Sequence, residues 1–306
     1  MNKREQMVSL NLQIDSMNVI DVKQESILIG SIPGTNSSYG TELWLTNSHS
    51  GNGEDYKKVP NADKAWEIDA YPKLLAEIRS ALGPKKLMSA AVPGLHRDML
   101  AFTKDTIPKI SASLDFFNIM TYDLMNRRDN ITKHHTGIDL SLEAIGAYIK
   151  NGVPAEKANL GFAFYVKWFK TDPNGGCRRN PIGCKTALME DPETGADLGQ
   201  AGQFAWCDDV PSELERSFHK ALFRALWDDI QGGNYYFDAD ESIFWSWDAP
   251  YVIEKKIPQI VEERRLGGIF VWGLGEDSPK WKHLEALTSG FLKHSKTAGP
   301  HIKDEL

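Results

Sequence analysis

From about Lys64 onward the sequence alternates between segments with helical periodicity and short apolar runs, and this alternation limits the fold more than any other feature. Apolar residues spaced along one helix face predict helices at 65–82, 96–113, 141–151, 212–231, 251–265 and 279–293. Short apolar runs predict strands at 86–92, 115–122, 158–166, 242–247 and 268–272. This rhythm is typical of a parallel sheet or barrel. We therefore predict an α/β fold with four βα units, half of an eight-unit barrel.

Two segments depart from this rhythm. The first 50 residues are polar, have no clear helix and offer only weak strands at 26–32 and 42–45, so they cannot supply three or four complete βα units. Residues 170–211 are rich in Gly, Pro, Asp and Asn, and such insertions usually build the walls of a site. We predict three parts: an irregular leader at 1–50, a partial barrel at 51–293 and a tail at 294–306.

Composition and charge exclude several partners. The net charge is −7 and Lys and Arg are dispersed, so we expect no nucleic-acid partner. No apolar stretch is long enough for a membrane-spanning helix, so we expect no membrane partner. Aromatic residues gather between Phe102 and Phe291. Flat rings suit the faces of sugars as well as a core, although core packing accounts for most of them.

Three cysteines occur in or near the Gly- and Pro-rich segment. Cys177 and Cys184 could close a short loop in an oxidising compartment, which leaves Cys207 without a partner. A zinc site would need further ligands at metal spacing. We therefore expect no metal and no other cofactor.

The two ends of the sequence point to different locations. The chain finishes with the four residues of an endoplasmic-reticulum retention address, and the partner would be a retention-signal receptor that binds Lys303, Asp304, Glu305 and Leu306. The first 22 residues contain no apolar run of the kind found in a signal peptide. We expect the endoplasmic reticulum or the secretory pathway if a signal peptide is encoded upstream.

Five stretches occur in the order in which similar stretches occur in family 18 glycoside hydrolases. They are GNGEDYKKVPNADKAW at 51–66, SAAVPG at 89–94, FFNIMTYD at 116–123, GFAFYVKWF at 161–169 and GGIFVWGLGED at 267–277. The chain resembles this family of chitinases, its fungal members above all, over residues 51–292. The resemblance implies an incomplete TIM-type (β/α)8 barrel in which strands five to eight are represented, with an insertion between strands seven and eight.

The resemblance also implies a reaction and a substrate. Family 18 enzymes use the substrate's own 2-acetamido oxygen as the nucleophile, which departs from the usual pair of carboxylates. Such chemistry needs a protonated carboxylic acid, a neighbouring Asp and a Tyr hydroxyl that hydrogen-bonds the acetamido group. The implied partners are chitin or N-acetylglucosamine oligosaccharides, cleaved with retention of configuration.

Matching positions carry the site residues over to this chain. The resemblance implies that Tyr122 holds the acetamido group and that Asp123 hydrogen-bonds the sugar beside it. Met120 would line the same wall, and Tyr165 would face the sugar from strand seven. Trp272 would form the hydrophobic floor of the pocket.

Three further residues are less certain members of the site. Lys167 stands where many relatives have Arg, which leaves its polar contacts open. His134 and His135 follow the sixth strand, and we expect a solvated loop pair on the rim of the site rather than substrate contacts.

The sequence departs from the family at strand four. Relatives carry an Asp-x-x-Asp-x-Asp-x-Glu run there that ends in the proton donor, and these 306 residues contain no such run. Counting back from Gly51 without gaps puts Asn47 in the Glu position, and an amide cannot donate the required proton. Glu42, Glu54 and Asp55 lie nearby in sequence, but we do not expect them to substitute.

Three hypotheses follow. The first is a chitinase, or a related endo-β-N-acetylglucosaminidase, that has lost its beginning through a wrong start codon or a missed exon junction. The second is a chitinase-like lectin that binds the sugar without cleaving it. The third is a splicing or pseudogene product without a stable fold. For the chain of 306 residues we expect little or no hydrolysis.

Overall fold

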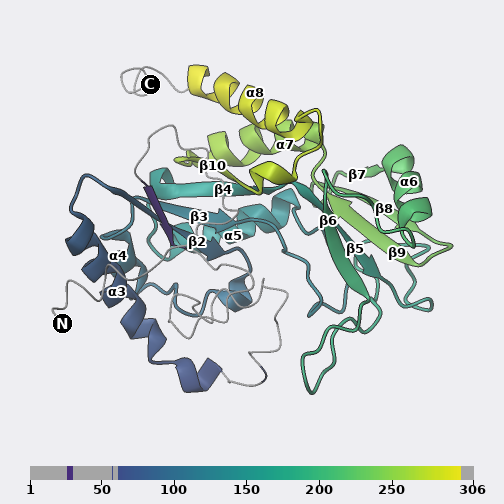
Figure 1. Cartoon of the computed structure of the whole chain (residues 1–306), viewed down its shortest axis with the longest axis horizontal. Helices are drawn as coiled ribbons and strands as arrows, with labels where there is room; N and C mark the ends of the chain where they lie inside the picture. Colours follow the sequence, from purple (N-terminus) through teal and green to yellow (C-terminus); the bar gives the residue numbers. More distant parts are fainter. Residues whose placement is uncertain (1–25, 30–56, 58–60, 298–306) are drawn as a thin grey trace.

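The computed structural model describes residues 26–29, 57 and 61–297, and this part of the chain contains two five-stranded sheets (Figure 1). The first sheet has the order β1-β2-β3-β4-β10, and its neighbouring strands are all parallel. Its strands are β1 (Ser26–Ile29), β2 (Leu87–Pro93), β3 (Phe116–Met120), β4 (Ala158–Ala163) and β10 (Gly268–Trp272). Among the described residues this sheet does not close into a barrel.

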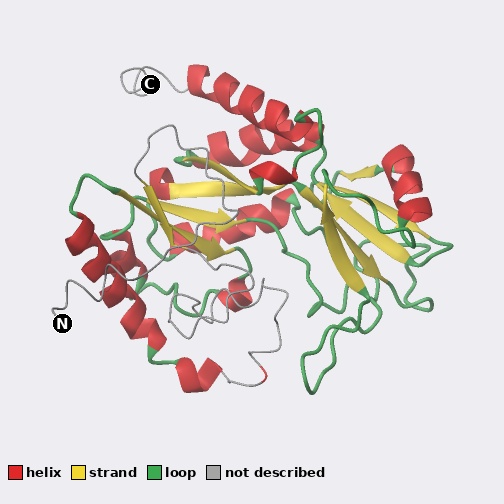
Figure 2. Ribbon diagram, viewed as in Figure 1, coloured by secondary structure: helices red, strands yellow, loops and turns green. Residues whose placement is uncertain are grey.

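Helices cover the parallel sheet (Figure 2). They are α3 (Glu67–Leu82), α4 (Ile107–Ser111), α5 (Ile138–Lys150), α7 (Pro250–Lys256) and α8 (Lys282–Thr297). In Figure 1, α3 and α4 lie near β2, and α7 and α8 lie near β10. Every residue of β4 is buried, as expected for a parallel strand covered on both faces. The core joins strand residues such as Phe117 and Phe162 to Leu75 and Ile257 from the helices.

The second sheet is antiparallel, with the order β6-β5-β9-β8-β7. Its strands are β5 (Tyr165–Lys170), β6 (Ala201–Ala205), β7 (Leu226–Asp228), β8 (Gly233–Asp238) and β9 (Ile243–Trp247). Helix α6 (Glu215–Arg224) packs on this sheet through Phe218, which meets Phe204 and Trp245. The sheet lies between β4 and β10 in the chain, where the insertion was predicted, but the prediction that 170–211 is irregular missed β6.

Strand formation changes the limits of two predicted elements. The strand predicted at 158–166 is divided, because β4 ends at Ala163 and β5 begins at Tyr165 in the other sheet. The helix predicted at 212–231 ends at Arg224, because Leu226 pairs with Tyr235 at the start of β7.

The helix predicted at 96–113 is largely absent. The segment forms a short 3-10 turn, η2 (His96–Asp98), and the five-residue α4. Between them the Thr103 amide donates to the Thr106 hydroxyl at 2.9 Å, and the Thr103 hydroxyl accepts the amides of Asp105 and Thr106. Such local side-chain bonds compete with helical ones, which apolar periodicity does not register.

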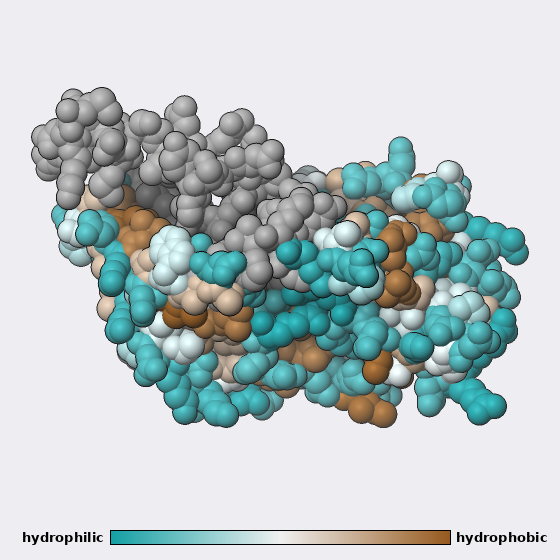
Figure 3. All heavy atoms as spheres, turned by 90° about the horizontal axis from the view of Figure 1, so that it is seen from below, coloured by the Kyte–Doolittle hydropathy of each residue, from teal (hydrophilic) through white to brown (hydrophobic). Residues whose placement is uncertain are grey.

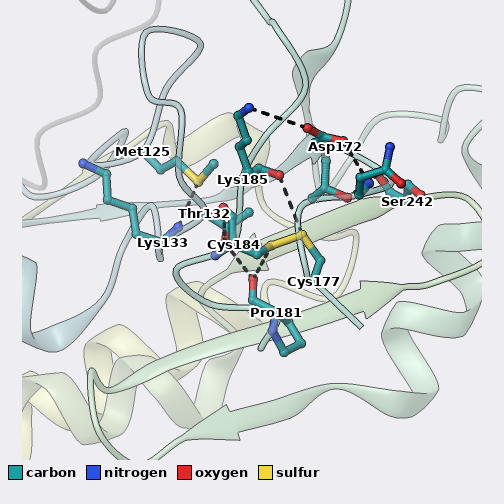
Figure 4. The surroundings of a disulfide bond; sticks show 11 residues. Met125, Thr132, Lys133, Asp172, Cys177, Pro181, Cys184, Lys185 and Ser242 are labelled. Carbon is teal, nitrogen blue, oxygen red and sulfur yellow. Dashed lines mark hydrogen bonds and ion pairs between the residues drawn. A yellow bond between two sulfur atoms is a disulfide. The ribbon is translucent and has the colours of Figure 1, made fainter. Parts of the chain in front are cut away.

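A disulfide joins Cys177 to Cys184 inside the insertion, which confirms that this pair closes a loop (Figure 4). Thr132, from the loop that follows β3, accepts the Cys184 amide at 3.0 Å and donates its hydroxyl to the Pro181 carbonyl at 2.7 Å. The disulfide loop is therefore attached to the parallel half of the fold. Cys207 is a free, exposed thiol.

Several predictions concern residues outside the described part. They are Glu42, Asn47, Glu54, Asp55 and the terminal residues Lys303, Asp304, Glu305 and Leu306. Of the predicted leader, only β1 is described. None of the described helices has the length and apolar character needed to cross a membrane. On the face seen in Figure 3, hydrophobic residues form separate patches among hydrophilic ones.

Candidate functional site

The carboxyl ends of the parallel strands bring the predicted site residues together. Met120 ends β3, Trp272 ends β10, and Tyr165 follows β4 by two residues. Tyr122, Met120 and Tyr165 belong to one buried apolar cluster with Phe270, and Trp272 packs against it half-buried. Function in parallel α/β folds concentrates at this edge of the sheet. The peptide bond between Trp272 and Gly273 is cis.

The chain leaves β3 in a conformation held by β4. The Thr121 hydroxyl donates to the Gly161 carbonyl at 2.7 Å and accepts the Gly161 amide at 2.9 Å. A Cβ on Gly161 would lie 2.8 Å from the Ile119 carbonyl oxygen, so this close approach requires glycine. Asp123 then adopts φ +54°, in the left-handed region. Non-glycine residues in that region are often found at functional sites.

Tyr122 offers a hydroxyl group to the pocket. Its side chain is 3% exposed, and its ring lies 6.3 Å from the Tyr165 ring and 6.1 Å from the Phe270 ring. Among the described residues no group hydrogen-bonds its hydroxyl. Burial raises the pKa of Tyr122 well above 10, and the negative charges of Asp123 and Glu276 raise it further. The phenol therefore stays protonated and can donate a hydrogen bond.

Asp123 is the centre of a polar cluster. Its Oδ1 accepts the Tyr165 hydroxyl at 2.9 Å and the Lys167 ammonium at 2.8 Å. Burial and the Asp123 charge hold the pKa of Tyr165 well above 10, so this phenol stays a donor. Lys167, whose contacts the sequence left open, is thus the cation that neutralises Asp123. Tyr165 and Lys167 are two residues apart in β5, and this spacing, which puts both side chains on one strand face, could have indicated the contact.

His134 and His135 correct a prediction, because both are fully buried rather than solvated. His134 Nε2 lies 3.0 Å from Asp228 Oδ2, and its ring packs against Tyr235. His135 Nδ1 lies 3.9 Å from Asp123 Oδ1, and neither ring nitrogen has a hydrogen bond among the described residues. Burial lowers the pKa of both histidines, that of His135 strongly.

Glu276 is a half-buried carboxyl group beyond the end of β10 that sequence reasoning missed. It ends the 3-10 turn η5 (Leu274–Glu276), four residues after Trp272. Burial raises its pKa to about 7, and the charges of Asp208 and Asp123 contribute. The adjacent Asp277 instead bonds His283 Nδ1 at 2.6 Å and the Leu284 amide at 2.9 Å. Nothing in the Glu-Asp pair of the sequence distinguishes these two environments.

A hollow of about 640 Å³ lies beside the insertion and not in the aromatic cluster. It is lined by residues 127–130, 172–173 and 185–190 and by Pro192. Its three basic side chains are paired: Arg127 with Glu190 at 2.8 Å, Arg128 with Asp98 at 2.9 Å and Lys185 with Asp172 at 3.8 Å. This pairing gives the hollow no excess of positive charge that would favour an anionic ligand.

An aromatic cluster with a hydrogen-bonded Tyr–Asp pair, at the carboxyl ends of parallel strands, defines the kind of site in which α/β proteins bind small polar molecules. Comparison with known proteins identifies the family. The family model for glycosyl hydrolases family 18 matches residues 44–277, and the chain belongs to this family as a chitinase-type member.

Two curated relatives illustrate the likeness. The chain is 24% identical over 287 residues to Chitinase B of Serratia marcescens, covering 74% of this chain and 55% of that protein. It is 27% identical over 215 residues to Nod factor hydrolase protein 1 of Medicago truncatula, covering 67% and 51% respectively. The chain thus spans about half the length of these relatives.

Solved structures support the fold. A chitinase from Rhizomucor miehei superimposes with a TM-score of 0.56 at 22% identity, over 72% of this chain and 66% of that one. A mutant family 18 chitinase from Cycas revoluta, in complex with (GlcNAc)4, superimposes with a TM-score of 0.53 at 20% identity, over 74% and 64%. The fold is α/β and TIM-barrel-like, although the parallel sheet of the described residues does not close into a barrel.

Proposed function

We propose that this chain binds oligosaccharides of β-1,4-linked N-acetylglucosamine in the cluster at the ends of β3, β4 and β10. By lineage the chain is a chitinase-type hydrolase with a retaining, substrate-assisted mechanism. One observation carries the proposal: the Tyr122 hydroxyl is buried, protonated and without a hydrogen-bond partner among the described residues. An unsatisfied buried donor is costly unless a ligand pairs with it.

The surrounding groups suit the acetamido group of such a sugar. The Tyr122 phenol would donate to the acetamido carbonyl, and the Asp123 carboxylate, held by Lys167 and Tyr165, would accept from the sugar. The half-buried Trp272 offers an aromatic face for the apolar side of the ring. The complex of the Cycas revoluta chitinase with (GlcNAc)4 supports the choice of ligand.

We further propose that the 306-residue chain hydrolyses this ligand poorly, if at all. It contains no Asp-x-x-Asp-x-Asp-x-Glu run, and loss of a general acid lowers the rate about 10²- to 10⁴-fold. The chain would then act as a lectin for the same sugar. Incubation with (GlcNAc)4 and mass spectrometry of the products separates the two functions, because a hydrolase releases shorter oligosaccharides and a lectin does not.

Calorimetric titration with (GlcNAc)4 tests the binding proposal. Tyr122→Phe removes one hydrogen-bond donor, and we expect about tenfold weaker binding. Tyr236→Phe, on the half-buried face of β8 in the other sheet, is the matched control and should bind like the wild type.

Cellotetraose, which lacks acetamido groups, shows whether the Tyr122 phenol recognises the acetamido group. It should bind more weakly than (GlcNAc)4 and should not distinguish Tyr122→Phe from the wild type. Equal affinity of wild type and Tyr122→Phe for (GlcNAc)4 would contradict the assignment.

A further inference from the structure

Glu276 lies close to the end of β10, in the turn η5 that follows Trp272 and Gly273. Its amide donates to the Gly273 carbonyl at 2.9 Å, which folds the turn back onto the end of β10. A Cβ on Gly273 would lie 3.2 Å from Glu276 Oε1, so the carboxyl group lies over the glycine that follows Trp272. The missing side chain at position 273 thus leaves room for the carboxyl group beside the predicted floor of the pocket.

The carboxyl group of Glu276 also influences the pKa of both phenols of the site. The charge of Glu276 raises the pKa of Tyr122 and of Tyr165, and the charge of Asp123 raises that of Glu276 in return. Such mutual effects require short separations in a poorly solvated region. The charge of Glu276 is thus felt by both phenols, and its carboxyl group lies beside Gly273, the residue that follows Trp272.

The ionisable groups around Glu276 belong to three separate parts of the chain. Asp123 follows β3 and Tyr165 lies in β5, and Asp208 follows β6. From the same loop the Cys207 thiol donates to the Gly275 carbonyl at 3.4 Å. The next residue, Asp277, turns away to His283 and α8.

The three neighbouring carboxyl groups differ in how their charge is compensated. Asp123 has the Lys167 ammonium at 2.8 Å, and Asp208 accepts the Ala205 amide at 3.0 Å. Among the described residues, the groups that influence the pKa of Glu276 include the Gly273 amide but no cation. Burial raises the pKa of Glu276 to about 7, so this carboxyl group takes up a proton near neutrality, and a protonated carboxyl is a hydrogen-bond donor.

We propose that Glu276 contacts the bound N-acetylglucosamine oligosaccharide as a neutral carboxylic acid and donates a hydrogen bond to a sugar oxygen. The inference rests on the proposed function, because it requires the sugar to occupy this pocket. It assigns a sugar contact to a residue outside the Met-x-Tyr-Asp element and makes binding dependent on pH near neutrality. No bond is made or broken, and one proton is retained or taken up on binding.

Titration of the wild type with (GlcNAc)4 from about pH 5 to about pH 9 tests this inference. The affinity should be constant in acid and should fall above the pKa of about 7, by up to about tenfold per pH unit. Repeating the titration near neutrality in buffers of different ionisation enthalpy should reveal proton uptake on binding.

Three variants test whether Glu276 is the group whose protonation controls sugar binding. Glu276→Gln keeps the shape and an N–H donor at every pH, so its affinity should be independent of pH and within about threefold of the wild type in acid. Asp208→Asn removes a neighbouring negative charge and should move the midpoint to lower pH. Glu285→Gln, on the exposed face of α8, should leave the profile unchanged.

Each outcome decides the matter. A flat wild-type profile overturns the inference while binding itself stands, and so does a Glu276→Gln profile that keeps the wild-type slope. Absence of (GlcNAc)4 binding at every pH refutes the proposed function and the inference together. If Glu276→Gln fails to fold, the direction of the Asp208→Asn shift remains decisive, and an unshifted midpoint counts against Glu276.

Discussion

The buried ion pair between Lys167 and Asp123 allows a quantitative test of the site's architecture. Replacement by Met in Lys167→Met keeps the length of the side chain and removes its charge. The two side chains are 10% and 12% exposed, and their charged atoms are 2.8 Å apart. Breaking such a pair leaves an uncompensated charge, at a cost of about 3–5 kcal/mol. Because Asp123 keeps the Tyr165 hydroxyl as a donor, we expect the lower end, about 3 kcal/mol.

Urea unfolding monitored by tryptophan fluorescence measures this loss as a shift of the midpoint. Adding Asp123→Asn to Lys167→Met also removes the negative charge that the ammonium group had neutralised. The double variant should therefore recover most of the lost stability. Lys282→Met is the matched control. Its pair with Glu285 is 57% and 64% exposed, so the loss should stay below about 0.5 kcal/mol.

Two results would refute this reasoning. A loss below about 1 kcal/mol in Lys167→Met would mean that solvent or another group replaces the ammonium. A double variant no more stable than Lys167→Met would mean that the lysine acts through packing of its stem and not through the charge of Asp123.

Two further predictions concern pH and the disulfide. Because burial lowers the pKa of His135 well below 6.5, the unfolded chain takes up a proton that the folded chain does not. Stability should therefore fall as the pH drops below about 6.5, by about 1.4 kcal/mol per unit for each such histidine. Urea midpoints in mild acid should drop less in His135→Gln, whereas the exposed His219→Gln should behave like the wild type. Loss of the disulfide in Cys177→Ser, whose loop spans a sequence separation of 7, should cost about 2.5 kcal/mol. Thermal unfolding of the oxidised protein checks this value, with Cys207→Ser as the unchanged control. An unaltered midpoint in Cys177→Ser would show that the loop is held by its hydrogen bonds alone.

The parallel sheet was predictable because its signal is local. Strands β3 and β10 fall within predicted runs and β2 extends one residue beyond its run, since strands covered on both faces need apolar residues almost throughout. The antiparallel sheet was not predicted, because its pairing is not local. Strand β5 pairs with β9, and Lys167 lies opposite Ser246 across a long separation in sequence. No short sequence pattern indicates a strand partner that lies so far along the chain.

The residues of the site also divide into those that the sequence indicated and those that only the structure revealed. Met120, Tyr122, Asp123, Tyr165 and Trp272 were found from motifs, and the structure gathers them at one edge of the sheet. Their roles toward a sugar remain predictions. The pairing of Lys167 with Asp123 and the part played by Glu276 came from the structure alone, because the state of a charge depends on burial and on neighbours from other strands.

The sequence by itself determined the α/β class, the family and the missing acidic run, because each is written in periodicity or in contiguous motifs. Only the tertiary structure decided which charged side chains lie next to one another. It buried the two histidines that the sequence placed on a solvated rim, and it gave the Asp123 carboxylate its cation. It also placed Glu276 where desolvation favours the proton. These outcomes depend on distances between separate strands, and periodicity carries no information about them.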